Sequence, residues 1–297
     1  MEAPVCLPYE RFAARRGERP LPEAFAGLWT AGSLDGLALP CIAIVGTRAA
    51  TAYGKALATR FAAAFAAHGC CVISGLALGI DAAAHCGALA GDGRTIGVLG
   101  SGHDRFFPSR NRKLAEAMID AGGAVLSPFA PGTAAKPAYF LQRNGIVAAL
   151  ADAVVVVEAP ARSGALNTAG WAAGRIPVFA VPGDVDRAHV AGCHALIRDG
   201  AILARGPADV LEDLRILPQA QTQPEGKTRA QPADALQARI LRQLEAGERT
   251  LGDFMRAANE PPANILAALC LLELQGFVEA RPGECYARVT GAGAARR

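Results

Sequence analysis

The sequence predicts an α/β protein with a Rossmann-like, doubly wound and mostly parallel sheet, followed by a small C-terminal winged-helix domain. Between residues 41 and 215, short apolar runs alternate with helical patterns, and these runs show little internal alternation of polar and apolar residues. Such strands are typical of a parallel sheet that helices cover on both faces. A change of composition near residue 215 separates this part from the rest.

The expected elements of the sheet follow one another from residue 41, each strand leading into a helix. Clusters of Gly, Pro, Ser and Asp between the apolar runs mark the turns. The expected strands are 41–46, 70–74, 95–99, 123–127, 153–158, 177–181 and 200–203. The expected helices are 52–68, 80–90, 110–121, 140–150, 164–174, 192–198 and 207–213.

The composition divides the chain into four parts. Residues 1–40 contain several Pro and Gly and are expected to be an irregular N-terminal segment, whereas residues 41–215 form the Rossmann-like domain. Residues 216–233 are rich in Pro, Gln and Thr and predict a flexible linker. Residues 234–290 predict the winged-helix domain, with helices over 234–246, after Thr250 and over 261–275, and then a hairpin around RPGE.

Charge and cysteine usage limit the classes of function. The net charge of +3 neither indicates nor excludes a nucleic-acid-binding protein, because a local basic patch matters more for binding than the total charge. The eight cysteines include no C-x-x-C pair, which favours reduced thiols in a cytoplasmic protein. The apolar runs are shorter than the roughly 18–20 residues that span a bilayer. Cys193 and His194 have no second cluster nearby, so no metal site is expected.

Glycine and small polar residues follow six of the expected strands. The carboxyl ends of parallel strands meet at one edge of a sheet, where open α/β sheets bind their ligands. The first of these loops is Gly46-Thr47-Arg48, and it leads into a helix whose free N–H groups could hold a phosphate. It contains neither G-x-G-x-x-G nor a P-loop, so no dinucleotide cofactor is expected.

Two further stretches bear on the ligand. Arg48 offers a forked cation suited to phosphate, although a salt bridge or a solvated side chain would also explain it. In KPAYFLQRNGIV, Lys136, Phe140, Arg143 and Asn144 combine cations with aromatic rings, as single-stranded nucleic acid requires; the alternative is a core role for the rings.

Three smaller features have ordinary structural alternatives. The neighbouring basic cluster, from Arg105 to Lys113, could equally be a solvated helix face. Ser163 can cap a helix and, with Gly164, can supply N–H groups for an anion. Asp81 and His85 share a helix face, but capping and packing explain them better than acid–base catalysis.

Taken together, these motifs resemble the DNA-processing protein family DprA, also called Smf. The resemblance runs in order through IVGTR, SGLALGIDAAAH, VLGSG, FPSRN, FLQRNGIVAAL, VVVEAPARSGALNTA, AVPGD and GCHALIRDGA, from about residue 28 to residue 213. Residues 234–289 resemble the winged-helix domain that many members carry at their C-terminus.

The resemblance implies a cytoplasmic, non-catalytic mediator of homologous recombination without a cofactor. Such a protein binds and protects incoming single-stranded DNA and helps to load RecA during natural transformation. The implied partners are single-stranded DNA, RecA and a second copy of the chain, with single-strand-binding protein and the competence machinery as further candidates and no membrane. The expected DNA-binding residues are Gly46, Thr47, Arg48, Ser74, Gly75, Gly102, Arg112, Lys136, Phe140, Arg143, Asn144, Ser163 and Gly164.

The sequence departs from the family pattern at several places. Many members begin with a helical SAM-like domain, which residues 1–40 are too few to form, so this domain is expected to be reduced or absent. Thr47 replaces the usual Ser and keeps its hydroxyl, whereas Pro128 stands where an acidic residue is usual. Gly145 replaces an Arg, which removes a cation near the expected groove.

Two other functions compete with this interpretation. One is a nucleotide-cleaving, phosphoribohydrolase-like enzyme. Such enzymes carry a catalytic glutamate in a loop that corresponds to RSGALNTAG here, and this loop contains no glutamate. Glu158 lies just upstream and would have to reach the groove. The other is a regulator that senses a nucleotide and binds duplex DNA through the winged helix. Acids and bases are about equally frequent in that domain, which disfavours strong duplex binding.

Overall fold

The computed structural model describes residues 3–8, 10–12, 27–216, 235–257, 260–274, 277–281 and 285–288. The chain splits into two units, Met1–Ala220 and Gln221–Arg297, which are described separately below. Most of the expected linker, residues 217–233, lies outside the described residues. Among the described helices, none has the length and apolar character needed to cross a bilayer.

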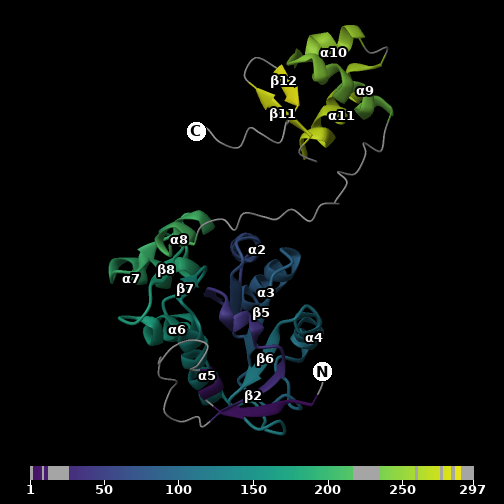
Figure 1. The fold of residues 1–297 in the computed structure, drawn as a ribbon. Coiled ribbons are helices and arrows are strands. Elements are labelled where there is room, and N and C mark those ends of the chain that lie inside the picture. Colours follow the sequence, from purple (N-terminus) through teal and green to yellow (C-terminus); the bar gives the residue numbers. More distant parts are fainter. Residues whose placement is uncertain are drawn as a thin grey trace. The chain divides into compact units, whose positions relative to one another are not determined.

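The first unit is built on a nine-stranded sheet in the order β1-β2-β6-β5-β4-β3-β7-β8-β9 (Figure 1). All neighbouring strands from β6 to β9 pair in parallel, which confirms the predicted doubly wound, mostly parallel sheet. The parallel strands are β3 (Cys41–Val45), β4 (Cys71–Ser74), β5 (Thr95–Val98), β6 (Ala124–Ser127), β7 (Ala153–Val156), β8 (Val178–Ala180) and β9 (Ile202–Leu203).

The N-terminal residues also take part in this sheet, so the expectation that residues 1–40 are irregular is wrong for the described part. β1 (Val5–Pro8) pairs antiparallel with β2 (Gly27–Gly32), and β2 pairs antiparallel with β6. A short 3₁₀ turn, Asp35–Ala38, then leads to β3. β1 is an edge strand that ends in Pro, and β2 begins and ends with Gly, so the composition of these residues did not indicate strands.

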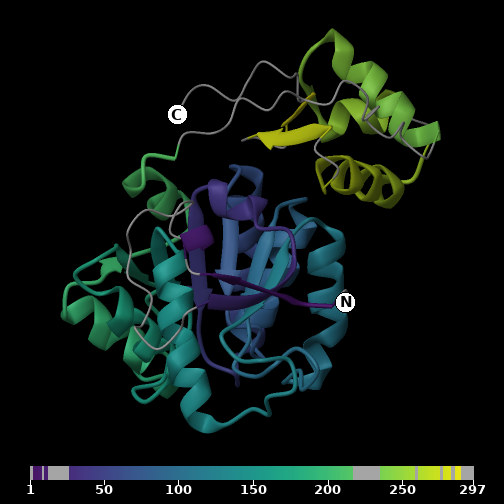
Figure 2. The ribbon, with the colours of Figure 1, turned by 60° about the horizontal axis from the view of Figure 1, so that its bottom comes forward.

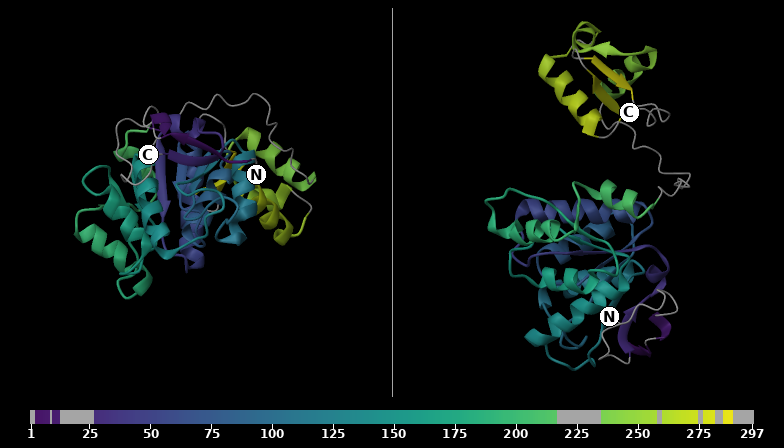
Figure 3. Two further views of the ribbon diagram at one scale, coloured as in Figure 1. Left: turned by 90° about the horizontal axis from the view of Figure 1, so that it is seen from below. Right: turned by 90° about the vertical axis from the view of Figure 1, so that its left-hand side faces the viewer.

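Helices cover both faces of the sheet (Figure 1, Figure 2 and Figure 3). On one face, α2, α3 and α8 pack with α4 alongside, and on the other face lie α5, α6 and α7. The helices are α2 (Ala52–Ala67), α3 (Ile80–Ala90), α4 (Arg112–Asp120), α5 (Pro137–Leu150), α6 (Gly164–Ala172), α7 (Ala191–Arg198) and α8 (Pro207–Asp213). Two 3₁₀ turns, Ser109–Asn111 and Ala188–Val190, precede α4 and α7.

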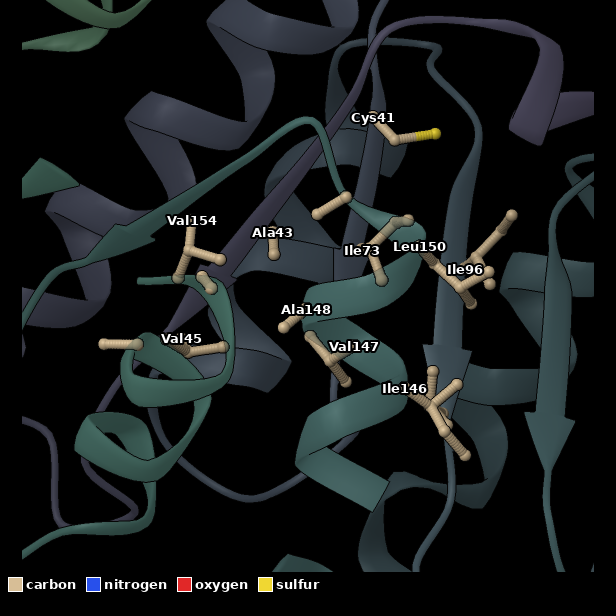
Figure 4. Close-up of a cluster of buried hydrophobic side chains, with 14 of the residues drawn as sticks. Cys41, Ala43, Val45, Ile73, Ile96, Ile146, Val147, Ala148, Leu150 and Val154 are labelled. Atoms are coloured by element: carbon tan, nitrogen blue, oxygen red, sulfur yellow. The ribbon is translucent and has the colours of Figure 1, made fainter. Parts of the chain in front are cut away.

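Alternating side chains of one strand reach both cores. Ala43 of β3 belongs to the core beneath α5, whereas Ile42 and Ile44 belong to the core beneath α2. Figure 4 shows Ile146 and Val147 of α5 lying over the apolar side chains of the strands. Burial on both faces explains the continuous apolar runs in the sequence and fixes the orientation of α5 against the sheet.

The second unit is a small helical domain with a three-stranded sheet in the order β10-β12-β11. Thr250 caps α10 as predicted: its hydroxyl accepts a hydrogen bond from Asp253 N at 3.2 Å, and Asp253 Oδ2 accepts from Thr250 N at 2.9 Å. The elements are α9 (Ala235–Gln243), a 3₁₀ turn (Leu244–Ala246), β10 (Arg249–Thr250), α10 (Leu251–Ala257), α11 (Pro262–Leu274), β11 (Val278–Arg281) and β12 (Cys285–Arg288).

Candidate nucleic-acid interface

A groove of about 550 Å³ lies where the strand order reverses, between β3 and β7. The loops that follow these two strands and the N-terminal part of α5 form its walls. This is the position at which open α/β sheets bind ligands. The lining residues are Val45, Gly46, Thr47, Arg48, Ala49, Gly75, Ala77, Asp81, Pro137, Phe140, Leu141, Arg143, Asn144, Val147, Pro160, Arg162, Ser163, Gly164, Ala165 and Thr168.

The Gly46–Thr51 segment, here called the GTR loop, is held by backbone hydrogen bonds on two sides. Thr47 N donates to the carbonyl of Glu158 at 2.6 Å, and Ile80 N donates to the carbonyl of Thr47 at 3.3 Å. At the end of the loop, Thr51 caps α2 by accepting from Gly54 N at 2.9 Å. The loop therefore has a fixed path, and Arg48 projects from its exposed centre.

Arg48 lies over the ring of Phe140, with its guanidinium carbon 4.9 Å from the ring centroid. Arg48 forms no salt bridge with any residue that the structure describes, so its charge is available at the rim of the groove. Phe140 is half-buried and also contacts Phe107, with ring centroids 5.9 Å apart. A cation and an aromatic face thus stand together at the groove entrance.

Arg143 forms part of the floor of the same groove and is buried. Its guanidinium donates to the carbonyls of Gly75 and Val98, the second at 2.7 Å. A Cβ at Gly75 would collide with this guanidinium, so the glycine makes the contact geometrically feasible. Burial lowers the pKa of Arg143 to about 10, and the group therefore stays charged at neutral pH.

Asp81 supplies the negative charge beside Arg143. Its Oδ2 accepts hydrogen bonds from Gly75 N at 3.1 Å and Ala77 N at 3.3 Å. Burial raises the pKa of the Asp81 carboxyl, while the Arg143 charge and the two N–H groups oppose that shift. His85 does not join this cluster: its Nδ1 lies 2.7 Å from the hydroxyl of Thr95, and burial lowers its pKa to about 3. Both residues are thus engaged within the fold.

Asn144 connects α5 to the start of α6. Its amide nitrogen donates to the carbonyl of Gly164 at 3.0 Å and to Asn167 Oδ1 at 3.3 Å. Ser163 stands at the N-cap of α6 without a capping hydrogen bond, and its hydroxyl is buried without a partner in the described chain. The start of α6 lines the groove, and the uncapped N–H groups of a helix start suit an anion.

A second hollow, of about 500 Å³, shares Pro137 and Phe140 with the groove. Its walls carry the cations Arg105, Arg112 and Lys136 and the half-exposed ring of Phe107. Arg112 lies over Phe106 at 5.3 Å, and Lys136 lies 5.5 Å from the ring of Tyr139. The basic cluster of the sequence therefore includes a cation-lined surface adjoining Phe140.

The structure brings most of the predicted DNA-binding residues together. The groove contains Gly46, Thr47, Arg48, Gly75, Phe140, Arg143, Asn144, Ser163 and Gly164, and the second hollow contains Arg112 and Lys136. Neither Ser74 nor Gly102 lines them: the Ser74 hydroxyl donates to the carbonyl of Ile44 at 2.6 Å, and Gly102 N donates to the carbonyl of Thr133 at 2.8 Å.

Sequence reasoning missed two residues that the structure adds to these surfaces. Arg162 is exposed and lines the groove, and Phe107 lines the second hollow. A basic residue directly before the Ser163-Gly164 helix start was a signal for Arg162. Gly145, by contrast, is buried and lines neither surface.

The comparisons with known proteins agree with this architecture. Residues 16–215 match the family model of DNA recombination-mediator protein A, and residues 223–284 match that of the DprA winged helix domain. A putative DNA processing protein DprA from Mycobacterium tuberculosis is 38% identical, over 97% of this chain and 76% of its own. Protein Smf from Escherichia coli is 36% identical, over 91% of this chain and 73% of its own.

Two solved structures are also similar. DprA from Streptococcus pneumoniae superposes with a TM-score of 0.61 and 33% identity, over 70% of this chain and 78% of that one. DprA from Helicobacter pylori, described for its single-stranded DNA binding mode, has a TM-score of 0.60 and 27% identity, over 71% of this chain and 95% of that one. The order of the motifs, the parallel sheet and the winged helix agree with both family matches. The chain therefore belongs to the DprA (Smf) family of DNA-processing proteins.

Proposed function

We propose that this protein is a non-catalytic recombination mediator that binds and protects incoming single-stranded DNA and helps to load RecA during natural transformation. The observation that carries this proposal is the pairing of Arg48 with Phe140 at the rim of the groove. An exposed cation suits a phosphate, and an aromatic face accepts any base. The relative from Helicobacter pylori, whose structure concerns single-stranded DNA binding, supports the proposal.

We propose that the predicted residues divide into contacts and supports. Arg48, Thr47 and the Ser163-Gly164 helix start are proposed to contact phosphates, and Phe140 is proposed to stack on a base. Lys136 and Arg112 are proposed to extend this row of phosphate contacts into the second hollow, which they line. The proposed supports, which line the groove or hold neighbouring segments through hydrogen bonds, are Gly46, Ser74, Gly75, Gly102, Arg143 and Asn144.

The competing functions receive less support from the geometry. The carboxylate of Glu158 is not part of the groove lining and accepts hydrogen bonds from Thr51, so it is poorly placed to act on a bound nucleotide. The sequence of α11, PANILAALCLLEL, carries no Lys or Arg, which disfavours it as a helix that grips the phosphates of duplex DNA.

The remaining features of the proposal are supported by the family resemblance. We place the protein in the cytoplasm, as a homodimer formed through the Rossmann-like unit, with RecA, single-strand-binding protein and the competence machinery as partners. The half-exposed Ile202 and Leu203 of β9, at one edge of the sheet, are compatible with such pairing. Sedimentation velocity over a range of concentrations would test the dimer.

The decisive experiment compares binding of fluorescent oligo-dT and a matched duplex by the wild type and Arg48→Ala at several salt concentrations. We expect preference for the single strand. Because a charge-assisted contact contributes about 1.5–3 kcal/mol, Arg48→Ala should weaken binding by roughly ten-fold or more. The slope of log affinity against log salt should fall by about 0.7.

Arg175→Ala is the matched control, because Arg175 is an exposed arginine beyond the far end of α6 from the groove. It should bind like the wild type. Equal binding to single strands and duplex would contradict the proposed function, whereas unchanged binding by Arg48→Ala would move the site elsewhere. The loading role is tested separately, by RecA activity on DNA coated with single-strand-binding protein. A lack of stimulation there would refute that part alone.

A further inference from the structure

Glu158 follows β7 at the carboxyl edge of the sheet but does not line the groove. It is 2% exposed, and it lines a separate cavity of about 400 Å³ together with Thr51, Tyr53 and His189. A buried carboxylate is costly unless its oxygens are well satisfied. Its contacts therefore show what it stabilises.

Within the described residues, the hydrogen bonds of the Glu158 carbonyl and carboxylate are all made to the GTR loop. Its carbonyl accepts from Thr47 N at 2.6 Å. Its carboxylate accepts from the hydroxyl of Thr51 at 2.6 Å and from Thr51 N at 3.0 Å. His189 Nε2 lies farther away, 3.7 Å from Oε1. Glu158 thus holds the loop at both ends, on either side of Arg48.

The start of α2 is shaped to admit this carboxylate. A Cβ at Gly54 would collide with the carboxyl group of Glu158, so a glycine is required there for the observed approach. Thr51 in turn uses its hydroxyl in both directions: it donates to Glu158 and accepts from Gly54 N at 2.9 Å. The negative charge also stands at the N-terminus of α2, where the helix dipole favours it.

We infer that Glu158 is a positioning residue for DNA binding: its carboxylate fixes Thr51 and, together with the backbone hydrogen bond at Thr47, holds Arg48 where it can meet a phosphate. The inference rests on the proposed function. Arg48 is exposed, and the fixed backbone on either side of it restricts the positions that its long side chain can reach. Without the Glu158 contacts, the loop would sample more conformations, and each DNA contact would then cost more ordering entropy.

The test uses Glu158→Gln, which keeps the size of the side chain but replaces one acceptor oxygen with a donor amide. In the full-length protein, binding of oligo-dT should weaken about five-fold, because the loop loses a charge-assisted hydrogen bond. The salt slope should move toward that of Arg48→Ala. Amide hydrogen exchange should accelerate in residues 47–54, while the midpoint of denaturation stays close to that of the control.

Asp152→Asn is the matched control. Asp152 Oδ2 accepts from Cys41 N at 2.8 Å, at the opposite end of β3, so the same carboxylate-to-amide change is made far from the loop. This control should bind DNA like the wild type. Thr51→Val, which removes the hydroxyl that Glu158 holds, should reproduce the effect of Glu158→Gln, and Thr51→Ser should restore binding. These two variants keep the test valid if Glu158→Gln folds poorly.

A double variant separates positioning from general destabilisation. If Glu158 acts through Arg48, then adding Glu158→Gln to Arg48→Ala should weaken binding by less than about two-fold, because the contact is already lost. An additive loss, or binding by Glu158→Gln equal to that by Asp152→Asn, would overturn the inference while leaving the proposed function intact. If the wild type shows no preference for single strands, both the function and the inference fall.

Discussion

Two arginines line the same groove and are held in different ways. Arg48 stands on an exposed loop, with an aromatic ring beneath it and no salt bridge within the described chain. Arg143 lies in the floor, where one nitrogen of its guanidinium donates to two backbone carbonyls and the Asp81 charge lies nearby. Arg143 is buried and bonded to the backbone, whereas Arg48 is exposed and therefore open to a ligand. The contrast therefore separates a proposed contact from a proposed support.

Substitution of the buried arginine, Arg143, should have the largest effect on stability. Arg143→Met leaves the carbonyls of Gly75 and Val98 without their donor and Asp81 without its neighbouring cation, and a buried group left unsatisfied costs about 1–3 kcal/mol. The free energy of unfolding, measured by urea denaturation, should fall by that amount. Arg48→Ala, as an exposed substitution, should change it by less than about 0.5 kcal/mol.

A second substitution tests whether the uncompensated charge of Asp81 causes part of the stability loss in Arg143→Met. Adding Asp81→Asn to Arg143→Met removes the uncompensated charge and keeps an acceptor for the backbone N–H groups, so part of the lost stability should return. If Arg143→Met is as stable as the wild type and loses only DNA binding, Arg143 is a contact, and the distinction between the two arginines fails.

The burial around Arg143 also predicts how stability depends on pH. Burial, followed by the Arg143 charge, lowers the pKa of His85 from 6.5 to about 3. Below pH 6.5, the unfolded chain therefore binds a proton at His85 that the folded chain does not accept until about pH 3. This contribution to stability is present above pH 6.5 and is lost as the pH falls, by up to about 1.4 kcal/mol per pH unit.

His85→Leu removes this titration. The free energy of unfolding of the wild type should fall more steeply between about pH 6.5 and about pH 4.5 than that of the variant, with the difference assigned to this one group. Denaturation curves at a series of pH values measure both slopes. Parallel pH dependences in the two proteins would show that His85 is protonated in the folded state as easily as in the unfolded one.

The contrast between the two arginines also marks what the sequence can predict. Apolar runs and turn residues predicted the parallel strands to within a few residues, because burial on both faces leaves a strong pattern. The sequence also predicted that Arg48, Phe140 and Ser163 lie at one edge of the sheet, since parallel strands end there together. All three line the groove. It missed β1 and β2, because β2 pairs with β6, which is distant in sequence, and β1 pairs with β2.

The directions of individual side chains could not be predicted from the sequence. Arg143 and Asn144 are adjacent in FLQRN, yet one donates toward β4 and β5 and the other toward α6. Glu158 is similar: its position after β7 places it near the groove, but its hydrogen bonds with Thr51 and its packing on Gly54 show that its carboxylate is directed to α2. Such directions depend on tertiary packing, which a local pattern does not encode.

The smallest expected effect concerns Phe140, and it sharpens the contrast at the rim. Stacking of a base on an aromatic ring contributes about 1–3 kcal/mol by alanine substitution, so Phe140→Leu, which keeps apolar bulk, should cost about 1 kcal/mol, or roughly five-fold in affinity for oligo-dT. Because no charge is lost, the salt slope should equal that of the wild type, unlike the slope for Arg48→Ala. Phe140→Tyr keeps a ring and should bind normally. A reduced salt slope for Phe140→Leu would show instead that the ring acts by holding Arg48 in place, and the stacking role would then be withdrawn.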